Sequence, residues 1–307
     1  MSNKEREARV VESFGRRVIV EDATGQRMLA ELFGKRLGCV CGDVVRIRLP
    51  VHAHDTPRVV AVAPRKTLFA RTDSRGRTEP LAANLTLLAV VIAPEPEPDP
   101  FIADRYLAAA AYAGIASVVV VNKCDLAGAH APEFTKIVDE YRGAGYEVIQ
   151  LSAHDSASVQ PLRERARGEV VMLVGQSGVG KSSLTNQLVP TSGRATRALS
   201  ESTREGRHTT VSTALFRIPS GGELIDSPGV RDYAPPLLED AEVQTGWPEI
   251  RSRASACRFN NCLHLREPGC AVTAAVESGE IAPRRYESYK RLLNIMRELA
   301  PEYARRR

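Results

Sequence analysis

A glycine-rich stretch at residues 175–183 has the residue types that hold phosphate groups. It fits the pattern G-x-x-x-x-G-K-[ST], follows the apolar run EVVMLV and opens the helix-like run SSLTNQL. Glycines allow a tight loop whose N–H groups point at phosphates, and the following helix N-terminus adds partial positive charge. We expect Lys181 to reach the β- and γ-phosphates and the Ser182 hydroxyl to bind Mg²⁺. The predicted contacts are Gly175, Gln176, Ser177, Gly178, Val179, Gly180, Lys181, Ser182 and Ser183.

A second stretch, Asn122-Lys123-Cys124-Asp125, indicates which base accompanies the phosphates. The Asp125 carboxylate can accept both N1–H and the 2-amino group of guanine. Adenine offers neither donor and would leave the carboxylate unpaired. We expect Asn122 to contact the base and tie neighbouring loops, and the Lys123 stem to lie along the ring. Ser152 and Ala153 follow another apolar run, where a backbone N–H is expected to meet guanine O6.

The magnesium and switch residues are predicted further along the chain. Asp226-Ser227-Pro228-Gly229 fits D-x-x-G, in which Asp226 holds Mg²⁺ through water and the Gly229 N–H meets the γ-phosphate. The stretch GRHTT, residues 206–210, lies between this motif and the phosphate loop. We expect Thr210, rather than Thr209, to close on Mg²⁺ and the γ-phosphate. The predicted magnesium ligands are Ser182, Thr210 and Asp226.

The residue after D-x-x-G bears on the rate of hydrolysis. Many small GTPases place a water-orienting Gln there, whereas this chain has Val230. Slow intrinsic hydrolysis is therefore expected. His208 is the nearest residue able to replace the Gln, and the alternative is that His208 only packs or binds a partner. The predicted catalytic residues are His208, Thr210 and Lys181.

Three cysteines and a histidine cluster near the C-terminus. The spacing Cys257-x4-Cys262-x-His264-x5-Cys270 offers three thiolates and one imidazole. Cys₃His is a closed structural zinc set that leaves no position for catalysis. A redox cluster or a chance grouping is the alternative. Because small metal domains fold on binding, loss of Cys257 is expected to unfold this region and leave nucleotide binding mostly intact.

The residues between these motifs predict the sheet that positions them. Apolar runs alternate with helix-like segments over residues 84–230, which indicates a parallel sheet covered on both faces. The predicted strands are 85–92, 117–121, 146–151, 169–174 and 223–226. The predicted helices are 104–114, 131–143 and 181–188, and the Pro-rich run 94–100 is predicted to be a loop.

Two further regions flank this α/β domain. Short strand-like runs at 16–22, 26–32, 44–49 and 58–64, separated by turn residues, predict a small barrel of OB or SH3-like type. After residue 236 the cysteine cluster is followed by helices predicted at 271–279 and 284–304. We therefore predict an OB-like β-barrel over 1–66, a nucleotide domain over 67–234 and a small zinc-binding helical domain over 235–307.

The order of the nucleotide motifs is a cyclic shift of the usual one. The base-reading motif precedes the phosphate loop here, whereas in an ordinary GTPase it follows the phosphate loop and D-x-x-G. A sheet whose termini lie close together tolerates such a permutation. The chain then leaves the domain just after DSPGVRDY, and we infer that the permutation connects this second switch to the C-terminal module.

Composition limits the partners and the compartment. The chain has 307 residues, a net charge of +5 and a pI of about 8.9, which permits a nucleic-acid partner without demonstrating one. The tail Arg305–Arg307 is expected to be a solvated end rather than a phosphate contact. The longest apolar run, 85–93, is shorter than the ~18 residues of a membrane span. The charged N-terminus lacks a secretory core, so no membrane partner and a cytoplasmic location are expected.

The chain resembles the RsgA/YjeQ family of circularly permuted GTPases over nearly its whole length. The matching stretches are DRYL (104–107), NKCD, GQSGVGKSS, GRHTT, DSPGVRD, CRFNNCLHLREPGC and CAVTAAVESGEIAPRRYESY (270–289). The resemblance implies an OB fold, a permuted GTPase core and a zinc domain in one monomeric chain. It also implies binding to the small ribosomal subunit and its rRNA, subunit-stimulated hydrolysis coupled to release, and a late role in subunit assembly.

The chain departs from the family at two places. Asn84-Leu85-Thr86-Leu87 replaces the family's Asn-Val-Asp-Gln-like string, and the barrel matches only through residues 34–36 and 42–43.

A GTP hydrolase that acts on the small ribosomal subunit is the first hypothesis for the function. A binding switch with negligible turnover is the second hypothesis, which Val230 keeps open. An ATP-dependent kinase is the third hypothesis, and the NKCD motif argues against it.

Overall fold

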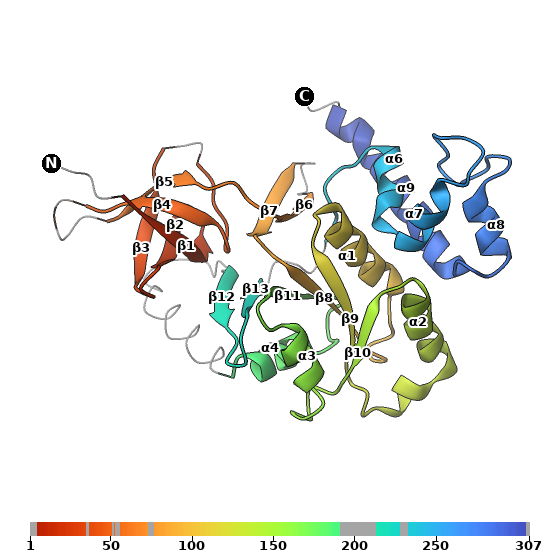
Figure 1. The fold of residues 1–307 in the computed structure, drawn as a ribbon, viewed down its shortest axis with the longest axis horizontal. Coiled ribbons are helices and arrows are strands. Elements are labelled where there is room, and N and C mark those ends of the chain that lie inside the picture. Colours follow the sequence, from red (N-terminus) through yellow and green to blue (C-terminus); the bar gives the residue numbers. More distant parts are fainter. Residues whose placement is uncertain are drawn as a thin grey trace.

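The structure, a computed structural model, describes the backbone of residues 5–34, 37–50, 52, 56–72, 77–190, 213–227 and 233–304, and side chains as far as residue 299. Figure 1 shows three parts along the longest axis, with a barrel at one end, an α/β layer structure in the centre and a helical part at the other end. In the described ranges, no helix combines the length and apolar character needed to cross a membrane.

The N-terminal part is a closed five-stranded barrel, as the sequence predicts. Its strands are β1 (Glu5–Phe14), β2 (Arg17–Asp22), β3 (Arg27–Leu32), β4 (Val44–Arg48) and β5 (Arg58–Val62). They pair in the order β1-β2-β3-β5-β4, and β1 closes the ring by pairing with β4. Alternate side chains fill the interior, including Val10, Val20 and Ile47. The sequence did not single out β1, because its first three residues are charged and exposed and obscure the alternation.

The central part contains six of the eleven strands of the main sheet. Its strands are β8 (Leu87–Ile92), β9 (Ala116–Val121), β10 (Glu147–Gln150), β11 (Val170–Val174), β12 (Thr213–Arg217) and β13 (Glu223–Asp226). They lie in the order β10-β9-β8-β11-β13-β12, and all neighbours are parallel except β12 and β13. The five predicted strands are present. The short antiparallel β12 was not predicted.

Helices cover both faces of this sheet, as predicted. They are α1 (Pro100–Tyr112), the 3₁₀ turn η1 (Ala127–His130), α2 (Pro132–Gly143), α3 (Gln160–Arg165) and α4 (Lys181–Leu188). Side chains of α1 and α2 share one buried core with the sheet, and those of α3 and α4 share a second core on its other face. Helix α1 begins four residues earlier than predicted, because Asp99 caps the Phe101 N–H and Pro100 suits the first helical position.

A strand pairing and two ion pairs join the barrel to the central part. Strand β1 pairs antiparallel with β12, with Glu12 opposite Ala214, so barrel and α/β domain form one eleven-stranded sheet. Two ion pairs cross this seam, Arg9 with Glu223 and Arg217 with Glu21. A separate two-stranded sheet of β6 (Leu68–Thr72) and β7 (Thr78–Ala83), which the sequence did not predict, follows the barrel.

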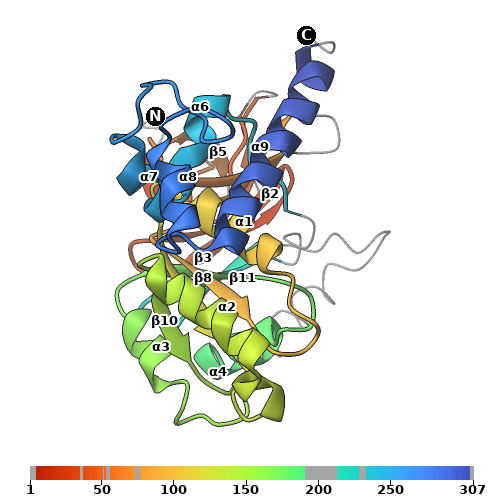
Figure 2. The ribbon, with the colours of Figure 1, turned by 90° about the vertical axis from the view of Figure 1, so that its right-hand side faces the viewer.

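The C-terminal part is helical and packs on α1. Its elements are α6 (Asp240–Val243), η2 (Gln244–Gly246), α7 (Pro248–Ala254), α8 (Ala271–Glu277) and α9 (Pro283–Ala304). The helices α8 and α9 match the two predicted ones, and α9 runs along the outside of this part (Figure 2). Trp247 and Tyr289 are fully buried at its centre, and Phe101 and Ala108 of α1 belong to the same core.

Candidate nucleotide and metal sites

The phosphate-loop sequence forms the turn between β11 and α4. Gly175 and Gly180 have φ angles of 137° and 94°, a region that favours glycine. A Cβ on Gly175 would lie 2.2 Å from the carbonyl oxygen of Val91, and one on Gly180 would lie 2.2 Å from Nδ2 of Asn122. Lys181 Nζ donates to the carbonyls of Gly175 and Gln176, at 2.8 and 2.6 Å. The loop is therefore folded around the Lys181 side chain, and only glycine fits at its two closest approaches.

The side chain of Gln176 points to a neighbouring loop. Its Nε2 donates to the carbonyl of Glu97 at 3.0 Å, and its Oε1 accepts the N–H of Asp99 at 3.0 Å. Any phosphate contact from this residue is thus left to its backbone. The partner loop is the Pro-rich stretch 94–99, which leaves the carboxyl end of β8 beside the phosphate loop.

This Pro-rich loop was predicted only as a connection, yet it contacts both nucleotide motifs. Besides Gln176, it receives Lys123, whose Nζ donates to the carbonyl of Glu95 at 2.9 Å. A Cβ on Gly178 would lie 3.1 Å from Cδ of Pro96, so the loop also packs directly against the phosphate loop. Its position at the end of a central buried strand was the available signal, since ligands of open α/β sheets bind at such ends.

Asn122 connects three of the predicted motifs. It is 1% exposed and follows the last residue of β9. Its Nδ2 donates to the carbonyl of Val179 in the phosphate loop at 2.8 Å, and its Oδ1 accepts the N–H of Ala153 at 2.9 Å. The Ala153 N–H, a predicted candidate for guanine O6, is therefore held by Asn122 here.

Asp125 lies at the surface, three residues after Asn122 in the chain. The side-chain hydrogen bond from Ser152 lowers the pKa of the Asp125 carboxyl, with smaller contributions that include the charges of His154 and Lys123. Asp125 is therefore ionised and acceptor-only at neutral pH, which is the form able to receive the two donors of guanine. Ser152 is held in turn by Ser158, whose hydroxyl accepts the Ser152 N–H at 3.0 Å.

Asp226 ends β13 at the same edge of the sheet as the phosphate loop. Desolvation raises the pKa of its carboxyl, and the charge of Lys181 acts in the opposite direction. In the register of the sheet, Asp226 is opposite Ala214 near the start of β12. The chain thus enters β12 and leaves β13 beside the phosphate loop. The predicted residues His208, Thr209, Thr210, Gly229 and Val230 lie outside the described residues.

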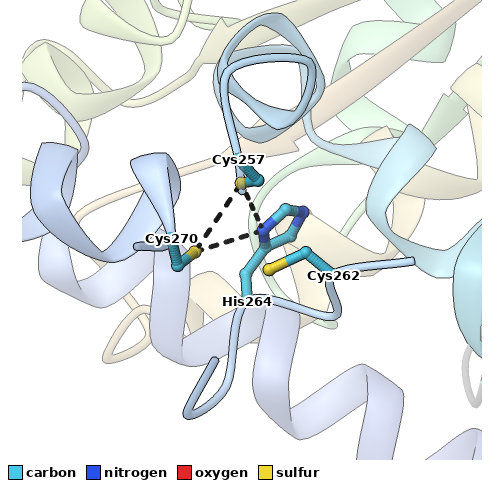
Figure 3. Close-up of side chains that lie close together, drawn as sticks. All are labelled: Cys257, Cys262, His264 and Cys270. Atoms are coloured by element: carbon cyan, nitrogen blue, oxygen red, sulfur yellow. Dashed lines mark hydrogen bonds between the residues drawn. The ribbon is translucent and has the colours of Figure 1, made fainter. Parts of the chain in front are cut away.

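The four predicted metal ligands come together on the C-terminal part (Figure 3). Their ligand atoms lie within 4.8 Å of one another. Nδ1 of His264 is 3.5 Å from Sγ of Cys257 and 3.4 Å from Sγ of Cys270, and those two sulfurs are 3.9 Å apart. Tetrahedral zinc with ordinary Zn–S and Zn–N lengths places its ligands about 3.5–3.8 Å apart. The donor set therefore fits one tetrahedral ion, and the spacing of Cys257, His264 and Cys270 is close to that of its ligands.

The loop that carries His264 is held by a carboxylate the sequence did not single out. Oxygens of Glu267 accept the backbone N–H groups of Leu263, Leu265 and Arg266, at 2.8, 2.7 and 2.9 Å. Partial burial raises the pKa of Glu267, but these N–H groups outweigh it and hold the pKa at about 2. His264 itself has a φ of 60°, a left-handed conformation uncommon outside glycine.

Burial also bears on the charge of the imidazole. His264 is 1% exposed, and desolvation lowers its pKa. A neutral ring keeps one nitrogen lone pair free for a metal ion. The described cysteines form no disulfide. Free thiols and a neutral imidazole are thus available as metal ligands.

Comparisons with known proteins agree with this arrangement. The model of the RsgA GTPase family matches residues 62–235. Proteins named small ribosomal subunit biogenesis GTPase RsgA are 38% identical in Pseudomonas putida, over 94% of this chain and 85% of the relative, and 40% identical in Azotobacter vinelandii, over 96% and 86%.

Solved structures show the same fold. The crystal structure of YjeQ from Thermotoga maritima superposes with a TM-score of 0.74 at 29% identity, covering 95% of this chain and 99% of that chain. YloQ, described as a circularly permuted GTPase, superposes with a TM-score of 0.72 at 24% identity, covering 96% of each chain. The permuted motif order predicted from the sequence is thus a property of this fold. The chain belongs to the RsgA family of GTP-hydrolysing enzymes.

Proposed function

We propose that this chain binds GTP, hydrolyses it and acts in the biogenesis of the small ribosomal subunit. The observation that carries the nucleotide assignment is the Asn122 side chain, which holds the phosphate loop and the Ser152-Ala153 loop at one place. The ribosomal assignment is supported by the relatives, which are named small ribosomal subunit biogenesis GTPases.

We assign the individual residues the roles that their motifs predict. Asp125 receives the guanine N1–H and 2-amino groups, with Asn122 and Lys123 fixing the base-binding loop. The backbone from Gly175 to Ser183 receives the phosphates, and Lys181 exchanges its two loop carbonyls for phosphate oxygens. From the D-x-x-G motif, Asp226 would hold Mg²⁺ through water and the Gly229 N–H would meet the γ-phosphate.

Magnesium is the ion proposed with GTP. Ser182 and Asp226 are at the same edge of the sheet, and Thr210 would complete the set when GTP is bound. When bound there, the ion would supply positive charge to the β- and γ-phosphates. Water attacks the γ-phosphorus, and the released products are GDP and inorganic phosphate. His208 is our proposed water-orienting residue, because Val230 stands at the usual Gln position.

We propose a structural zinc ion at Cys257, Cys262, His264 and Cys270. Four protein ligands close the coordination shell, so the ion holds the C-terminal part together and takes no part in hydrolysis. We also propose three domains over 1–66, 67–234 and 235–307, acting as a monomer in the cytoplasm. The barrel and the zinc domain would contact the subunit and its rRNA, and hydrolysis would be coupled to release.

Turnover of GTP by the full chain tests this function, with purified small subunits, with large subunits and with neither. Stimulation well above tenfold by small subunits alone is expected, because the bound subunit would complete a site in which Val230 cannot orient water. Equal rates under all three conditions would overturn the stimulated-hydrolase proposal. Tight GTP binding with such rates would instead support a nucleotide-gated binding switch, for which Val230 is the motivating residue.

A further inference from the structure

Gln244 contacts the candidate metal site from outside the four ligands. It is the first residue of η2, and its Oε1 lies 2.7 Å from Nε2 of His264. Nδ1 of the same ring faces the sulfurs of Cys257 and Cys270 (Figure 3). The two ring nitrogens therefore have different partners, a side-chain amide on one side and the cysteine cluster on the other.

A second contact sets the orientation of the Gln244 amide. Its Nε2 donates to the carbonyl of Ala241 at 3.1 Å. A carbonyl can only accept and an amide nitrogen can only donate, so the amide oxygen is the atom that faces His264. Because that oxygen cannot donate, the hydrogen bond requires a proton on Nε2 of the imidazole. A neutral ring protonated at Nε2 has its free lone pair on Nδ1.

We propose that Gln244 is a positioning residue of the metal site. It holds His264 in the tautomer and ring orientation that bind zinc through Nδ1. Ligating histidines commonly donate their other N–H to an oxygen acceptor, which fixes the ring and makes it a better ligand. Gln244 supplies that acceptor here, from a segment 20 residues before His264 in the chain. The proposal rests on the proposed zinc site and not on GTP hydrolysis.

The segment that carries Gln244 is held by the nucleotide domain. The hydroxyl of Tyr112, at the end of α1, donates to the carbonyl of Val243 at 2.6 Å. A Cβ on Gly246 would lie 2.6 Å from that hydroxyl and 2.7 Å from Cβ of Ala108, so the turn packs tightly on α1. The acceptor for His264 is thereby fixed by contacts outside the cysteine loop. We infer that metal affinity depends on this packing of η2 against α1 as well as on the four ligands.

Three substitutions separate positioning from general stability. Gln244→Leu keeps much of the side-chain volume and removes the acceptor. Gln244→Glu restores an acceptor for Nε2–H, although it loses the bond to Ala241. Thr245→Ala is the matched control, because Thr245 lies in the same turn and its hydroxyl donates to the Glu242 carbonyl at 2.7 Å.

The first measurement is zinc affinity of the full chain, by competition with a chromophoric chelator. Gln244→Leu should weaken zinc binding about 10- to 100-fold. Gln244→Glu and Thr245→Ala should stay within a few-fold of the unsubstituted chain. Unchanged affinity in the folded Leu variant, or equal losses in all three variants, would overturn the positioning role.

The second measurement needs no variant. Long-range ¹H–¹⁵N spectra of the zinc-loaded full chain should show His264 with metal-bound Nδ1 and protonated Nε2. Metal bound through Nε2 would overturn the proposal even if the Leu variant did not fold. A chain that binds no zinc would overturn the proposed metal itself, which is a distinct result.

Discussion

Oδ1 of Asp104 lies 2.6 Å from Nη1 of Arg285, and the two residues are 0% and 1% exposed although 181 positions separate them. Asp104 is on α1 and Arg285 is on α9. The same carboxylate also accepts from Arg284 at 2.8 Å, and Arg285 is paired with Glu249 at 2.7 Å. A buried charge network therefore fixes the C-terminal part to the nucleotide domain.

Removal of Asp104 should destabilise the whole chain. Asp104→Ala leaves the buried Arg285 and the partly exposed Arg284 short of a partner, and breaking a buried pair costs about 3–5 kcal/mol. The measurement is the free energy of unfolding by denaturant. Asp240→Ala is the control, because its ion pair with Arg297 is about 40% exposed on both sides and should contribute ~0–1 kcal/mol. Similar losses in the two variants would contradict the assignment of a buried network.

Loss of the Asn122 side chain should weaken nucleotide binding more than it weakens the fold. Asn122→Ala removes the bonds to Val179 and Ala153 that join the phosphate loop to the base-binding loops. A lost buried hydrogen bond costs about 1–3 kcal/mol, so GDP and GTP affinity should fall roughly tenfold to a hundredfold. Titration with a fluorescent guanine nucleotide measures it. Cys124→Ser, in the free position of the same motif, should bind normally.

A change at Asp125 should alter base preference. Asp125→Asn presents an amide donor where the guanine 2-amino group donates, so the affinity for GTP should fall by more than tenfold. The same amide can donate to the 2-oxo group of xanthine, and xanthosine triphosphate should become the preferred nucleotide. Competition between the two triphosphates decides the point. Retained preference for GTP would remove Asp125 from the base contact.

Glu12 gives a pH-dependent prediction at the seam between barrel and nucleotide domain. It is 8% exposed, and burial raises the pKa of its carboxyl above 4.5, against a smaller opposing effect of Arg27. A raised carboxyl pKa favours the folded state below the unfolded-state pKa, and this contribution is lost as pH rises through the folded-state pKa. Glu12→Gln should therefore raise the melting temperature at pH 7.5, with a smaller difference at pH 4.5.

The control for Glu12 is Glu31→Gln, at an exposed position of the same barrel. Its melting temperature should follow that of the unsubstituted chain at both pH values. An equal gain from Glu12→Gln at pH 4.5 and 7.5 would mean that burial of the charge is not the cause.

Zinc removal should leave nucleotide binding mostly intact while lowering stability. Cys257→Ser takes away one ligand, and small metal domains lose their fold with the ion. The base and phosphate loops lie on the sheet and make no contact with the cluster among the described residues. However, Phe101 and Ala108 of α1 share the C-terminal core, so the melting temperature of the whole chain should fall. Calorimetry and nucleotide titration on one preparation separate the two effects.

The described residues that follow each switch motif contact other parts of the chain. Tyr233, the first described residue after D-x-x-G, stacks against Phe69 and Tyr106 with ring centroids 5.0 and 4.9 Å away. Its hydroxyl donates to the Ala70 carbonyl at 2.9 Å. On the other side, β12 begins just after the first switch stretch and pairs with β1 of the barrel. The described chain that follows each switch motif is therefore fixed to another part of the protein, by a strand pairing or by a ring stack.

The sequence by itself determined the chemistry of this protein. The phosphate loop, the NKCD motif and the cysteine spacing depend on residue types at short separations, and apolar periodicity located the strands that carry them. Their permuted order also follows from position in the chain alone. These features depend on residues that lie close together in the sequence, so the sequence alone is enough to predict them.

Only the tertiary structure decided how distant residues meet. The pairing of β1 with β12 depends on backbone groups that any sequence provides, and the Asp104–Arg285 pair joins helices far apart in the chain. The contact of Gln244 with His264 arises because η2 packs against α1. Single polar residues of this kind have no periodicity or motif, since their partners are chosen by packing of the whole chain.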